Sequence, residues 1–421
     1  MRVEKINEKI TRITENTLIC GIDIGKTNCC ARFCDYRGLE VYHKVWFDRT
    51  KDLDVIGCNI TAAMYKEKKT DVIIAFEPTG HYWLNIDKYF KDCNQETVLM
   101  PTKAVKEEKD SYDGQPIKSD SRDAILIARL TSQGKYVKPI ERNDIYQDIY
   151  SGYRLYDDKQ KELNRIKNKI HVWNDKYFPE LEHVYKIDSV GIKAIYENQL
   201  LPNEIAEMIE EDFLKLMKEN NLRANKNSIR KVKELALKTS GIKPDKYTKK
   251  EIKELYKRYQ ETLSEMEEIK KELIELASQI DYVEKAVEIC GIGYISMIGI
   301  IAETGDLNNY DHAKQVLKMS GLSLKESASG QKKGKKHISK RGRAVLRRNL
   351  KQIGIALVGK NSFFKQLHNY YTTQRQNNLA KIISVNAIIR KFVYILIALV
   401  KNKESFDEEK ARKESYILSN C

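Results

Sequence analysis

The chain has 421 residues, of which 41% are hydrophobic, so it can bury a sizeable core and is not disordered by default. Its length favours two or three domains, and its formal net charge is +15 with a pI of about 9.1. Such a basic excess indicates a polyanionic partner, most often nucleic acid, with an anionic membrane surface as the weaker alternative.

The eight cysteines form no CxxC pair and have no histidines at zinc-finger spacing, so we expect them to be reduced and mostly buried. The N-terminus, MRVEKINEKITRITEN, lacks the apolar core of a signal sequence. The longest C-terminal apolar run, residues 392–400, is nine residues long, which is too short to span a bilayer. We therefore expect a cytoplasmic protein without membrane contact.

The first part of the chain alternates between strand and helix patterns. Strands are expected at residues 17–24, 28–35, 39–47, 71–77 and 96–100, with a helix ending near residue 68. Because hairpin-linked strands precede the first helix, this order favours a ribonuclease-H-like α/β layer over a doubly wound nucleotide-binding fold. The corresponding domain is predicted to cover residues 1–135, and from about residue 119 the pattern is helical.

The stretch GIDIGKTNCC, residues 21–30, allows three interpretations. A phosphate-binding loop of the Walker type is one residue short here, and Cys20 stands where its first glycine is needed. An actin-like kinase begins with a similar strand, but the second such hairpin is absent from the C-terminal half, which leaves this a weaker alternative. The third interpretation is a nuclease strand that ends in a metal-binding carboxylate, Asp23.

Four carboxylates support the third interpretation. Glu77 ends one apolar strand and Asp23 lies near the end of another, and Asp120 and Asp123 are three residues apart on one helical face. An oxygen-rich set of this kind suits Mg²⁺, which phosphodiester chemistry uses to neutralise charge. Taken singly, Asp23 could be a turn residue, Glu77 a strand terminus and Asp120 a helix cap. Taken together, they favour a metal site.

Residues 136–282 are predicted to form a helical, coiled-coil segment. Apolar residues recur at spacings of three and four at Ile145, Ile149, Tyr153, Tyr156, Leu163, Ile166, Ile170, Trp173 and Tyr177, and again at Ile252, Leu255, Tyr259, Leu263, Met266, Ile269, Leu273, Leu276 and Ile280. We expect the tyrosines to pack in a core rather than stack on bases. Two apolar seams of this length are hard to bury in one hairpin, so a homo-oligomer, a dimer or a tetramer, is expected.

A second globular, mostly helical domain is predicted at residues 283–405, followed by a charged tail at 406–421. Gly291 and Gly293 fit a helix-hairpin-helix turn whose N–H groups meet a phosphate, although a plain helix-helix turn is possible. Residues 331–348 contain nine Lys or Arg and no acid, which predicts nucleic-acid contact rather than a solvated loop. The contacts expected there are Lys332, Lys333, Lys335, Lys336, Lys340, Arg341 and Arg343.

Six motifs, in this order, resemble the DEDD transposases of the bridge-RNA-guided insertion-sequence recombinases: GIDIGK, EPTGHY, DSRDA, ICGIGYISMIGIIAETGD, GLSLKESASGQ and ISKRG. The resemblance implies a RuvC-like domain, a coiled-coil segment and a transposase domain with a nucleophilic serine. It implies donor and target DNA as substrates and a structured guide RNA as a partner.

The resemblance also assigns residues. It implies that Asp23, Glu77, Asp120 and Asp123 are the four metal-binding acids. It further implies that Ser329 is the nucleophile that forms a phosphoserine link to DNA. Ser327 is the nearest competitor. In relatives two serines often adjoin before the glycine, and here Ala328 replaces the first of them, so Ser329 keeps the place next to Gly330. The acids and the serine could meet within one chain or between chains.

Two other functions remain open from the residues alone. A RuvC-like junction-cleaving nuclease would use water as the nucleophile and leave Ser329 incidental. A catalytically silent nucleic-acid-binding scaffold would need only the basic residues. A tyrosine recombinase is disfavoured, because the sequence has no HxxR pair.

Overall fold

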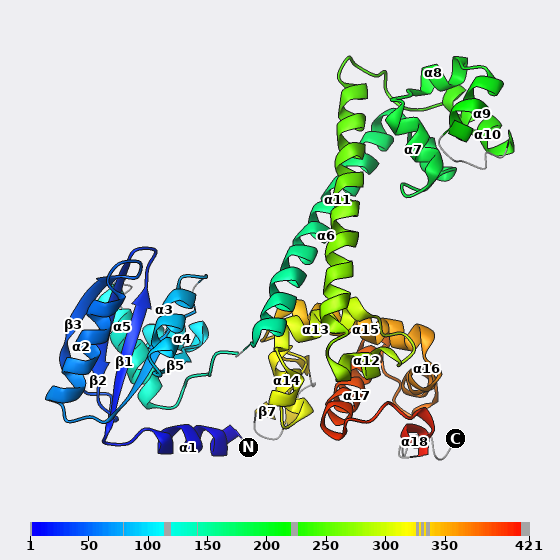
Figure 1. Ribbon diagram of the computed structural model, residues 1–421. Coiled ribbons are helices and arrows are strands. Elements are labelled where there is room, and N and C mark those ends of the chain that lie inside the picture. The colour runs from blue at the N-terminus through cyan, green and yellow to red at the C-terminus, as the bar shows by residue number, and fades with distance from the viewer. Residues whose placement is uncertain are drawn as a thin grey trace. The chain divides into compact units, whose positions relative to one another are not determined.

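A computed structural model describes residues 2–78, 80–112, 119–140, 142–219, 226–325, 328–329, 332–333 and 337–413. The chain divides into two compact units, Met1–Glu141 and Arg142–Cys421, and each is described by itself (Figure 1). The finer boundaries after residues 135, 282 and 405 stay predictions.

The first unit is built on one five-stranded sheet. Its strands are β1 (Thr17–Ile24), β2 (Asn28–Cys34), β3 (Glu40–Asp48), β4 (Asp71–Phe76) and β5 (Glu96–Leu99), in the order β3-β2-β1-β4-β5. β1, β2 and β3 form an antiparallel meander, while β4 pairs in parallel with β1 and β5 in parallel with β4. All five predicted strands are confirmed, with ends that agree to within one residue.

Helices cover both faces of this sheet. They are α1 (Arg2–Arg12), α2 (Leu53–Lys66), α3 (Trp83–Asp92), α4 (Thr102–Tyr112) and α5 (Asp120–Ser132). Apolar residues of α2 and α3 share one core with Ile22 and Ile74, whereas those of α4 and α5 share a second core with Ile19 and Ile73. This alternation along each strand is the two-residue period expected of a sheet buried on both faces.

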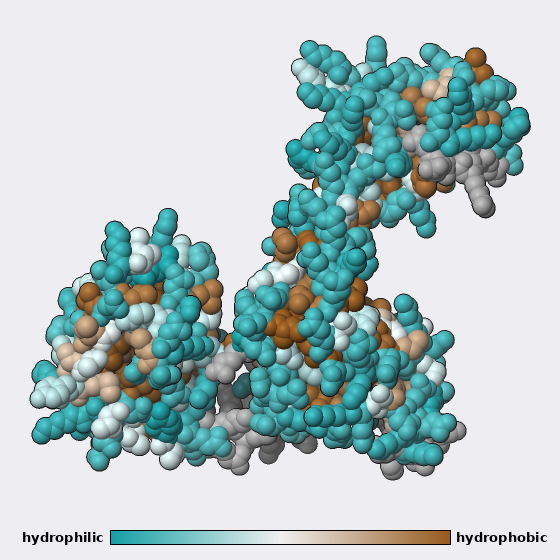
Figure 2. Space-filling view, in the orientation of Figure 1, coloured by the Kyte–Doolittle hydropathy of each residue, from teal (hydrophilic) through white to brown (hydrophobic). Residues whose placement is uncertain are grey.

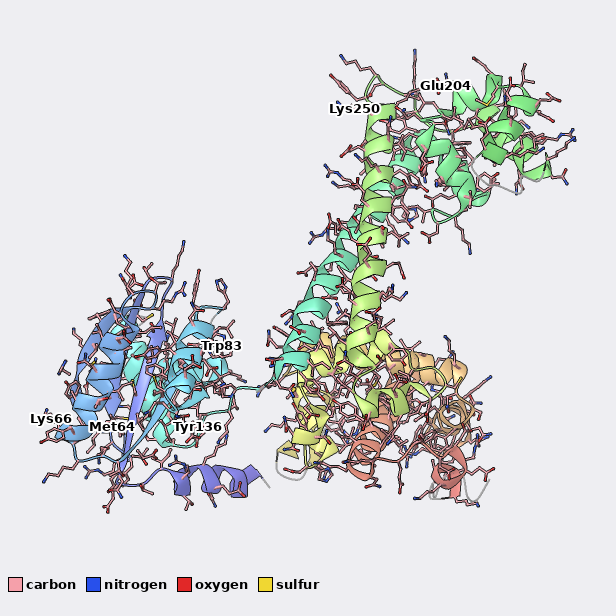
Figure 3. All side chains as sticks on the ribbon, in the orientation of Figure 1. Met64, Lys66, Trp83, Tyr136, Glu204 and Lys250 are labelled. Carbon is pink, nitrogen blue, oxygen red and sulfur yellow. The ribbon has the colours of Figure 1, made fainter. Side chains whose placement is uncertain are left out.

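The N-terminal helix α1 was not predicted. It is held to the rest of the first unit by Lys9, whose ammonium donates to the backbone carbonyl of Tyr136 and lies 4.8 Å from the centre of the Tyr136 ring (Figure 3). Arg12 adds an ion pair to Glu96 at 3.0 Å. These contacts fix the helix beside the end of β5.

The second unit contains two long helices that pack along each other as a hairpin, α6 (Asp144–Tyr177, 34 residues) and α11 (Thr248–Ala277, 30 residues) (Figure 1). Most of the predicted seam is buried, including Tyr153, whose hydroxyl donates to Asn349 at 2.9 Å. Core packing of that tyrosine is therefore confirmed. Leu263 is an exception with 38% exposure, and Tyr256 is buried instead.

Five short helices lie at the tip of the hairpin. They are η1 (Pro179–His183), α7 (Val190–Glu197), α8 (Pro202–Glu207), α9 (Glu210–Glu219) and α10 (Lys226–Leu237). Glu204, labelled in Figure 3, accepts a hydrogen bond from the Leu201 amide at 3.0 Å and pairs with Lys249 at the start of α11. The tip helices are thus joined to the hairpin by polar as well as apolar contacts.

The remaining helices pack at the other end of the hairpin. They are α12 (Asp281–Val287), α13 (Tyr294–Thr304), η2 (Leu307–Asn309), α14 (Ala313–Met319), α15 (Ala344–Lys360), α16 (Ser362–Asn369), η3 (Tyr370–Gln374), α17 (Lys381–Asn402) and α18 (Glu408–Lys413). Two small ladders interrupt them, β6 (Leu324–Lys325) with β9 (His337–Ile338) and β7 (Ala328–Ser329) with β8 (Lys332–Lys333). Figure 2 shows apolar side chains gathered where the hairpin meets these helices.

Helix α17 is long and apolar enough, by length and composition alone, to cross a membrane. The helix has 22 residues, so it is much longer than the nine-residue apolar run at 392–400 that was expected to be too short to span a bilayer. One face carries Ile388, Phe392 and Leu396, all fully buried among α15 and neighbouring helices. Burial of this kind is what the core helix of a globular protein shows, and a single such helix is weak support for a membrane span.

The cysteines are free wherever the structure describes them. Cys20, Cys29, Cys30 and Cys34 are buried in the first unit, as expected. Cys58, Cys93 and Cys290 are exposed, so four of the seven described cysteines are buried.

Candidate active site

Asp23 and Glu77 lie at the same edge of the sheet. Ile22 of β1 is paired with Phe76 of β4 in parallel register, and each acid is the next residue along its chain. Because the carboxyl ends of neighbouring parallel strands meet at one edge, the two carboxylates are adjacent there. The strand register therefore places Asp23 and Glu77 at the sheet edge predicted from the sequence.

The other two acids reach this edge on helix α5. Asp120 is the first residue of α5, and Ser119 is its N-cap residue, so the alternative in which Asp120 caps the helix is wrong. The helix packs on β1 and β2 with no room to spare, since a Cβ atom at Gly21 would lie 2.3 Å from the carbonyl oxygen of Ala124. Glycine at this position lets the first turn of α5 approach Asp23.

A second contact holds the first turn of α5 in place. The Arg32 guanidinium on β2 donates to the Ser121 hydroxyl at 2.6 Å and forms an ion pair with Glu40 on β3. Ser121 lies between the two acids of the helix. These contacts therefore link β2, β3 and α5 beside the four acids.

The electrostatics of Asp23 show that the four acids share one field. Burial, which is the largest cause, and the negative charges of Asp123, Asp120 and Glu77 together raise the pKa of Asp23 to about 6, while Lys109 opposes the shift. A carboxyl group whose pKa rises for these reasons lies where uncompensated negative charge collects. A cation bound at this site would therefore be stabilised by the negative charge of the acids.

Lys109 on α4 is a member of the site that the sequence did not suggest. Its ammonium lies 2.5 Å from Oδ2 of Asp123, which is only 8% exposed. The residue sits in the run KEEKD, where charges of both signs alternate and nothing distinguishes one lysine from the next. Only the packing of α4 on α5 brings it to Asp123.

The four acids fit a hard divalent cation by their chemistry, because all supply carboxylate oxygens. Within the described ranges, no three His, Cys, Asp or Glu side chains are grouped closely enough to hold a metal ion as they stand. The Lys109 ammonium bonded to Asp123 supplies positive charge to the cluster in this conformation. For a metal ion to bind, Asp123 would therefore have to release the Lys109 ammonium.

The pKa of Asp23 predicts how metal binding depends on pH. A metal needs the ionised carboxylate, so Mg²⁺ affinity should be nearly constant above pH 7 and fall as the pH drops through about 6. With one proton competing, the fall approaches about tenfold per pH unit. Calorimetric titration at about pH 5 and about pH 7.5 measures it.

Lys109→Met provides the matched control for that titration. Since Lys109 lowers the pKa of Asp23, its removal should move the midpoint of the fall to higher pH. Equal Mg²⁺ affinity at both pH values, or a midpoint unmoved in Lys109→Met, would show that Asp23 does not bind the ion.

Ser329 belongs to the second unit, and the structure describes its backbone. It lies in β7, paired with Lys332 of β8, so only residues 330 and 331 separate the two strands. β6 and β9, which flank β7 and β8 in the sequence, form a second antiparallel pair. The structure therefore places Ser329 near the turn of a small β-hairpin. The predicted competitor Ser327 and the predicted contacts Lys335 and Lys336 lie outside the described residues.

The chain after this hairpin is anchored by backbone hydrogen bonds. The amide of Lys340 donates to Gly321 at 2.9 Å and that of Arg343 donates to Met319 at 2.7 Å. The backbone of Lys340 has a φ of +52°, an unusual conformation for a lysine. The side chains of Lys340 and Arg341 remain exposed. These two residues are therefore presented on a fixed loop.

The prediction that the basic run lacks counter-ions is wrong for two of its residues. Arg343 lies 3.5 Å from Glu303, a buried acid of α13, and also donates to the Glu303 carbonyl at 2.6 Å. Arg348 pairs with Asp157 of α6 at 2.5 Å. Both acids are far from the run in sequence, which is why no local pattern reveals them. Arg343 consequently has a structural role whether or not it also contacts nucleic acid.

The two glycines of the predicted phosphate-binding turn join α12 to α13. Gly291 has a φ of +102°, and a Cβ atom there would lie 3.1 Å from the Ala356 carbonyl oxygen on α15. Gly293 is the N-cap residue of α13, with open space at its Cβ position. Gly291 is therefore required by its backbone conformation, whereas the helix-hairpin-helix motif and its phosphate binding stay predictions.

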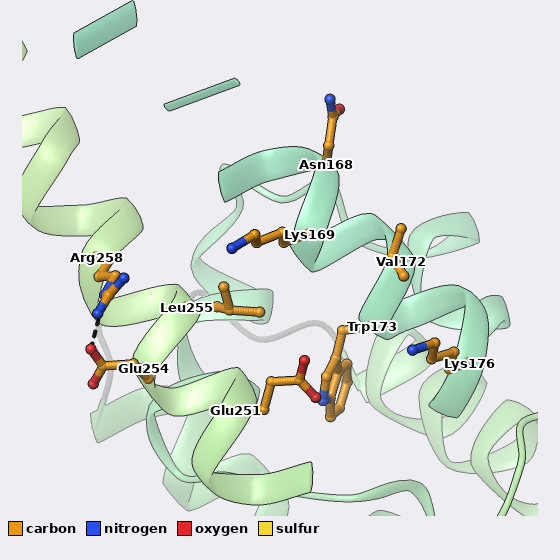
Figure 4. Close-up of a pocket in the computed structure, with 9 residues that line it drawn as sticks. All are labelled: Asn168, Lys169, Val172, Trp173, Lys176, Glu251, Glu254, Leu255 and Arg258. Atoms are coloured by element: carbon orange, nitrogen blue, oxygen red, sulfur yellow. Dashed lines mark hydrogen bonds and ion pairs between the residues drawn. The ribbon is translucent and has the colours of Figure 1, made fainter. Parts of the chain in front are cut away.

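A hollow between α6 and α11 is drawn in Figure 4. It is lined in part by Trp173 and Val172, and its Glu254 and Arg258 form an ion pair at 2.9 Å. The Trp173 indole donates to the Thr248 carbonyl at 3.2 Å. None of the predicted site residues lines this hollow, so it belongs to the packing of the hairpin.

Comparison with known families gives two matches. The DEDD transposase domain of the IS110 type matches residues 20–179, which include all four acids. The transposase domain of the IS116/IS110/IS902 family matches residues 284–372, which include Gly291, Gly293 and Ser329. The chain belongs to the IS110 family of DEDD transposases. No curated protein matches the chain.

Membership of the IS110 family confirms the resemblance inferred from the six motifs. The protein is accordingly a DNA-processing enzyme, the DNA transposase of an insertion sequence, and its substrates are DNA. A DEDD transposase domain implies dependence on a divalent metal. This dependence agrees with the four acids around Asp23, whose negative charge Lys109 offsets only in part.

Proposed function

We propose that this IS110-family transposase cuts and rejoins DNA through a Mg²⁺ site formed by Asp23, Glu77, Asp120 and Asp123 and a phosphoserine intermediate on Ser329. The observation that carries the proposal is the placement of Asp23 and Glu77 at one edge of the sheet, where burial and the charges of the other three acids together raise the pKa of Asp23 to about 6. The strand order β3-β2-β1-β4-β5 supports a RuvC-like, ribonuclease-H-like layer for these acids.

The roles of the residues follow from their chemistry. A bound Mg²⁺ would neutralise charge on the scissile phosphate and help to activate the attacking hydroxyl. The Ser329 oxygen would form a bond to phosphorus as the bond to a deoxyribose oxygen breaks, and the serine proton would pass to the leaving oxygen. Attack by a DNA hydroxyl on the phosphoserine would restore the phosphodiester. Because bond energy is conserved, no nucleotide hydrolysis is needed.

The position of Ser329 at the end of the β7–β8 ladder supports its role, because functional residues are often placed where strands give way to connecting segments. The acids and the serine would meet within one chain or between two chains of an oligomer. The neighbouring lysines would neutralise the DNA strand there.

Three further parts of the proposal concern partners and location. The turn at Gly291 and Gly293 would act as a helix-hairpin-helix element on a DNA phosphate. A structured RNA would direct the enzyme to its target and donor DNA, as the resemblance to guided recombinases implies. We also propose a cytoplasmic location without membrane contact, which the burial of α17 side chains in a core supports.

The α6–α11 hairpin supports a coiled-coil role in assembly as a dimer or tetramer. Leu155 and Val172 of α6 are each 51% exposed, and Leu263 of α11 is 38% exposed, so apolar surface remains along the pair. We expect a light-scattering mass that is a multiple of 49.0 kDa and that shifts toward 49.0 kDa in Leu155→Glu/Leu263→Glu. A wild-type mass near one chain, with and without nucleic acid, would contradict this.

The experiment that tests the proposed function is a strand-transfer assay on DNA that carries the ends of the element. Joined recombinant strands support the proposal. Free ends without joining would favour the junction-cleaving nuclease, in which water is the nucleophile. Binding without either product would favour the non-catalytic scaffold.

The lysines of the basic run that follows Ser329 allow a quantitative prediction. Replacing Lys332, Lys333, Lys335 and Lys336 with Gln should flatten the slope of log K against log salt by about 0.9 for each phosphate of duplex DNA that the variant no longer neutralises. Fluorescence anisotropy over a salt series measures the slope. Lys66→Gln/Lys68→Gln, on exposed residues of the first unit, is the control and should change little. An unchanged slope in the fourfold variant would show that the lysines are merely solvated.

A further inference from the structure

Trp46 stands out as a large aromatic side chain left in solvent beside the four acids. It lies on β3, the edge strand of the sheet, and is 49% exposed. Within the part of the chain that the structure describes, its indole makes no hydrogen bond and no ring contact. Because single apolar side chains are common on protein surfaces, the position of Trp46 relative to the four acids decides whether it has a role.

The strand register puts Trp46 in one row with Asp23. Asp23 of β1 is paired with Cys30 of β2, and Cys30 is paired with Trp46 of β3. Directly paired residues project from the same face of a sheet, so all three side chains point the same way. Two strand spacings separate the ends of the row, which places Trp46 about 10 Å from Asp23.

The core residues confirm which face this is. Ile22, Ala31 and Val45, the neighbours of the three row members, all lie in the core beneath α2 and α3. The row therefore faces the side covered by α5. Since α5 packs on β1 and β2 while β3 is the next strand outward, Trp46 lies at the uncovered margin of that face.

One exposed cation lies beside the row. Lys44 is two residues before Trp46, at the β-bulge between Tyr42 and Val45, and its positive charge acts on Cys30, the middle member of the row. It is exposed and has no ion pair to any described residue. An aromatic side chain beside a cation is the arrangement that binds a single nucleic-acid strand.

We propose that Trp46 stacks on a base of the DNA strand whose phosphate lies at the four acids, and that Lys44 contacts a neighbouring phosphate of that strand. The spacing of about 10 Å corresponds to about three base steps of stacked DNA. The inference rests on the proposed function for the choice of DNA. Trp46 would thus position the strand without touching the reacting atoms.

Binding without chemistry tests the inference. In an Asp23→Asn background, the affinity for a forked DNA duplex with thymine arms should fall roughly 5- to 150-fold in Trp46→Ala, the range expected for one base stacked on an aromatic ring. Trp46→Phe should recover much of it, which separates weakened stacking from misfolding. Tyr65→Ala is the matched control, because Tyr65 is 88% exposed on α2, the opposite face, and should change nothing.

Photochemical crosslinking locates the contact in the protein with Trp46 intact. With 5-iodouracil in the thymine arms, peptide mapping should find the adduct on Trp46. Equal affinities of Trp46→Ala and Tyr65→Ala, adducts confined to other residues, or adducts formed only with an RNA fork would each overturn the inference. If Trp46→Ala binds DNA as wild type does while strand transfer is intact, this inference alone is refuted, whereas a Trp46 adduct in a protein that cannot transfer strands refutes the proposed function alone.

Discussion

Replacement of Asp23 with Asn is expected to abolish strand cleavage and joining while raising the melting temperature at about pH 7.5. The loss of activity should exceed about a hundredfold, because even residues that only support metal ligands change activity or affinity by 10- to 100-fold. The gain in stability has a separate cause. Burial and three neighbouring acids disfavour the ionised form of Asp23, so its charge opposes folding at neutral pH.

The sign of the stability effect can be checked over a pH series. The folded-state pKa of Asp23, about 6, is above its ordinary value of 3.8, so the folded protein holds this proton more tightly than the unfolded chain. The gain from Asp23→Asn should therefore be largest above pH 6 and disappear as the pH falls toward 4. Scanning calorimetry measures this difference.

Asp92→Asn is the control for both effects, since Asp92 is an exposed acid of the same unit that pairs with Lys88 at 2.9 Å. It should retain activity and melt nearly as wild type does. Full activity in Asp23→Asn, or a variant destabilised at neutral pH, would contradict the account of the four acids.

Ser329→Ala is expected to abolish recombination while leaving Mg²⁺ and DNA binding nearly unchanged. One hydroxyl contributes little to an interface dominated by charge, whereas a missing nucleophile leaves nothing to form the covalent intermediate. The measurements are strand transfer and anisotropy on the same preparation. Ser329→Cys should keep only traces of cleavage.

Ser327→Ala is the matched control for the nucleophile, because it removes a serine hydroxyl two residues away in the same segment. It should retain most of the activity. If Ser327→Ala is inactive in strand transfer and Ser329→Ala is active, Ser327 is the nucleophile instead of Ser329. If both cleave DNA with ordinary free ends, the junction-cleaving nuclease replaces the recombinase.

Much of the first unit could be predicted because its strands are short apolar runs bounded by turns. That pattern predicts where each strand begins and ends along the chain. Because β1 and β4 are neighbours in the sheet, their carboxyl ends bring Asp23 and Glu77 together. The position of Asp120 and Asp123 on one face of α5 follows from helical spacing alone. What spacing cannot show is the distance from α5 to the sheet, which depends on the absence of a side chain at Gly21.

The remaining features depend on contacts between distant segments. Lys109, Glu303 and Asp157 each meet a charged partner that no local pattern connects to them. The two-residue strands around Ser329 are too short to carry a periodicity, so a hairpin there could not be predicted. In the sequence Trp46 is only one residue of a strand, because its alignment with Asp23 appears once the register is known.

The most direct test of the account is to trap the intermediate on a nicked or mismatched DNA that stalls rejoining, and to locate the adduct by mass spectrometry. The account predicts DNA covalently joined to protein on denaturing gels, with the bond on Ser329, in the presence of Mg²⁺ and not after chelation. Cleaved DNA that carries no protein, undiminished in Ser329→Ala, would contradict it.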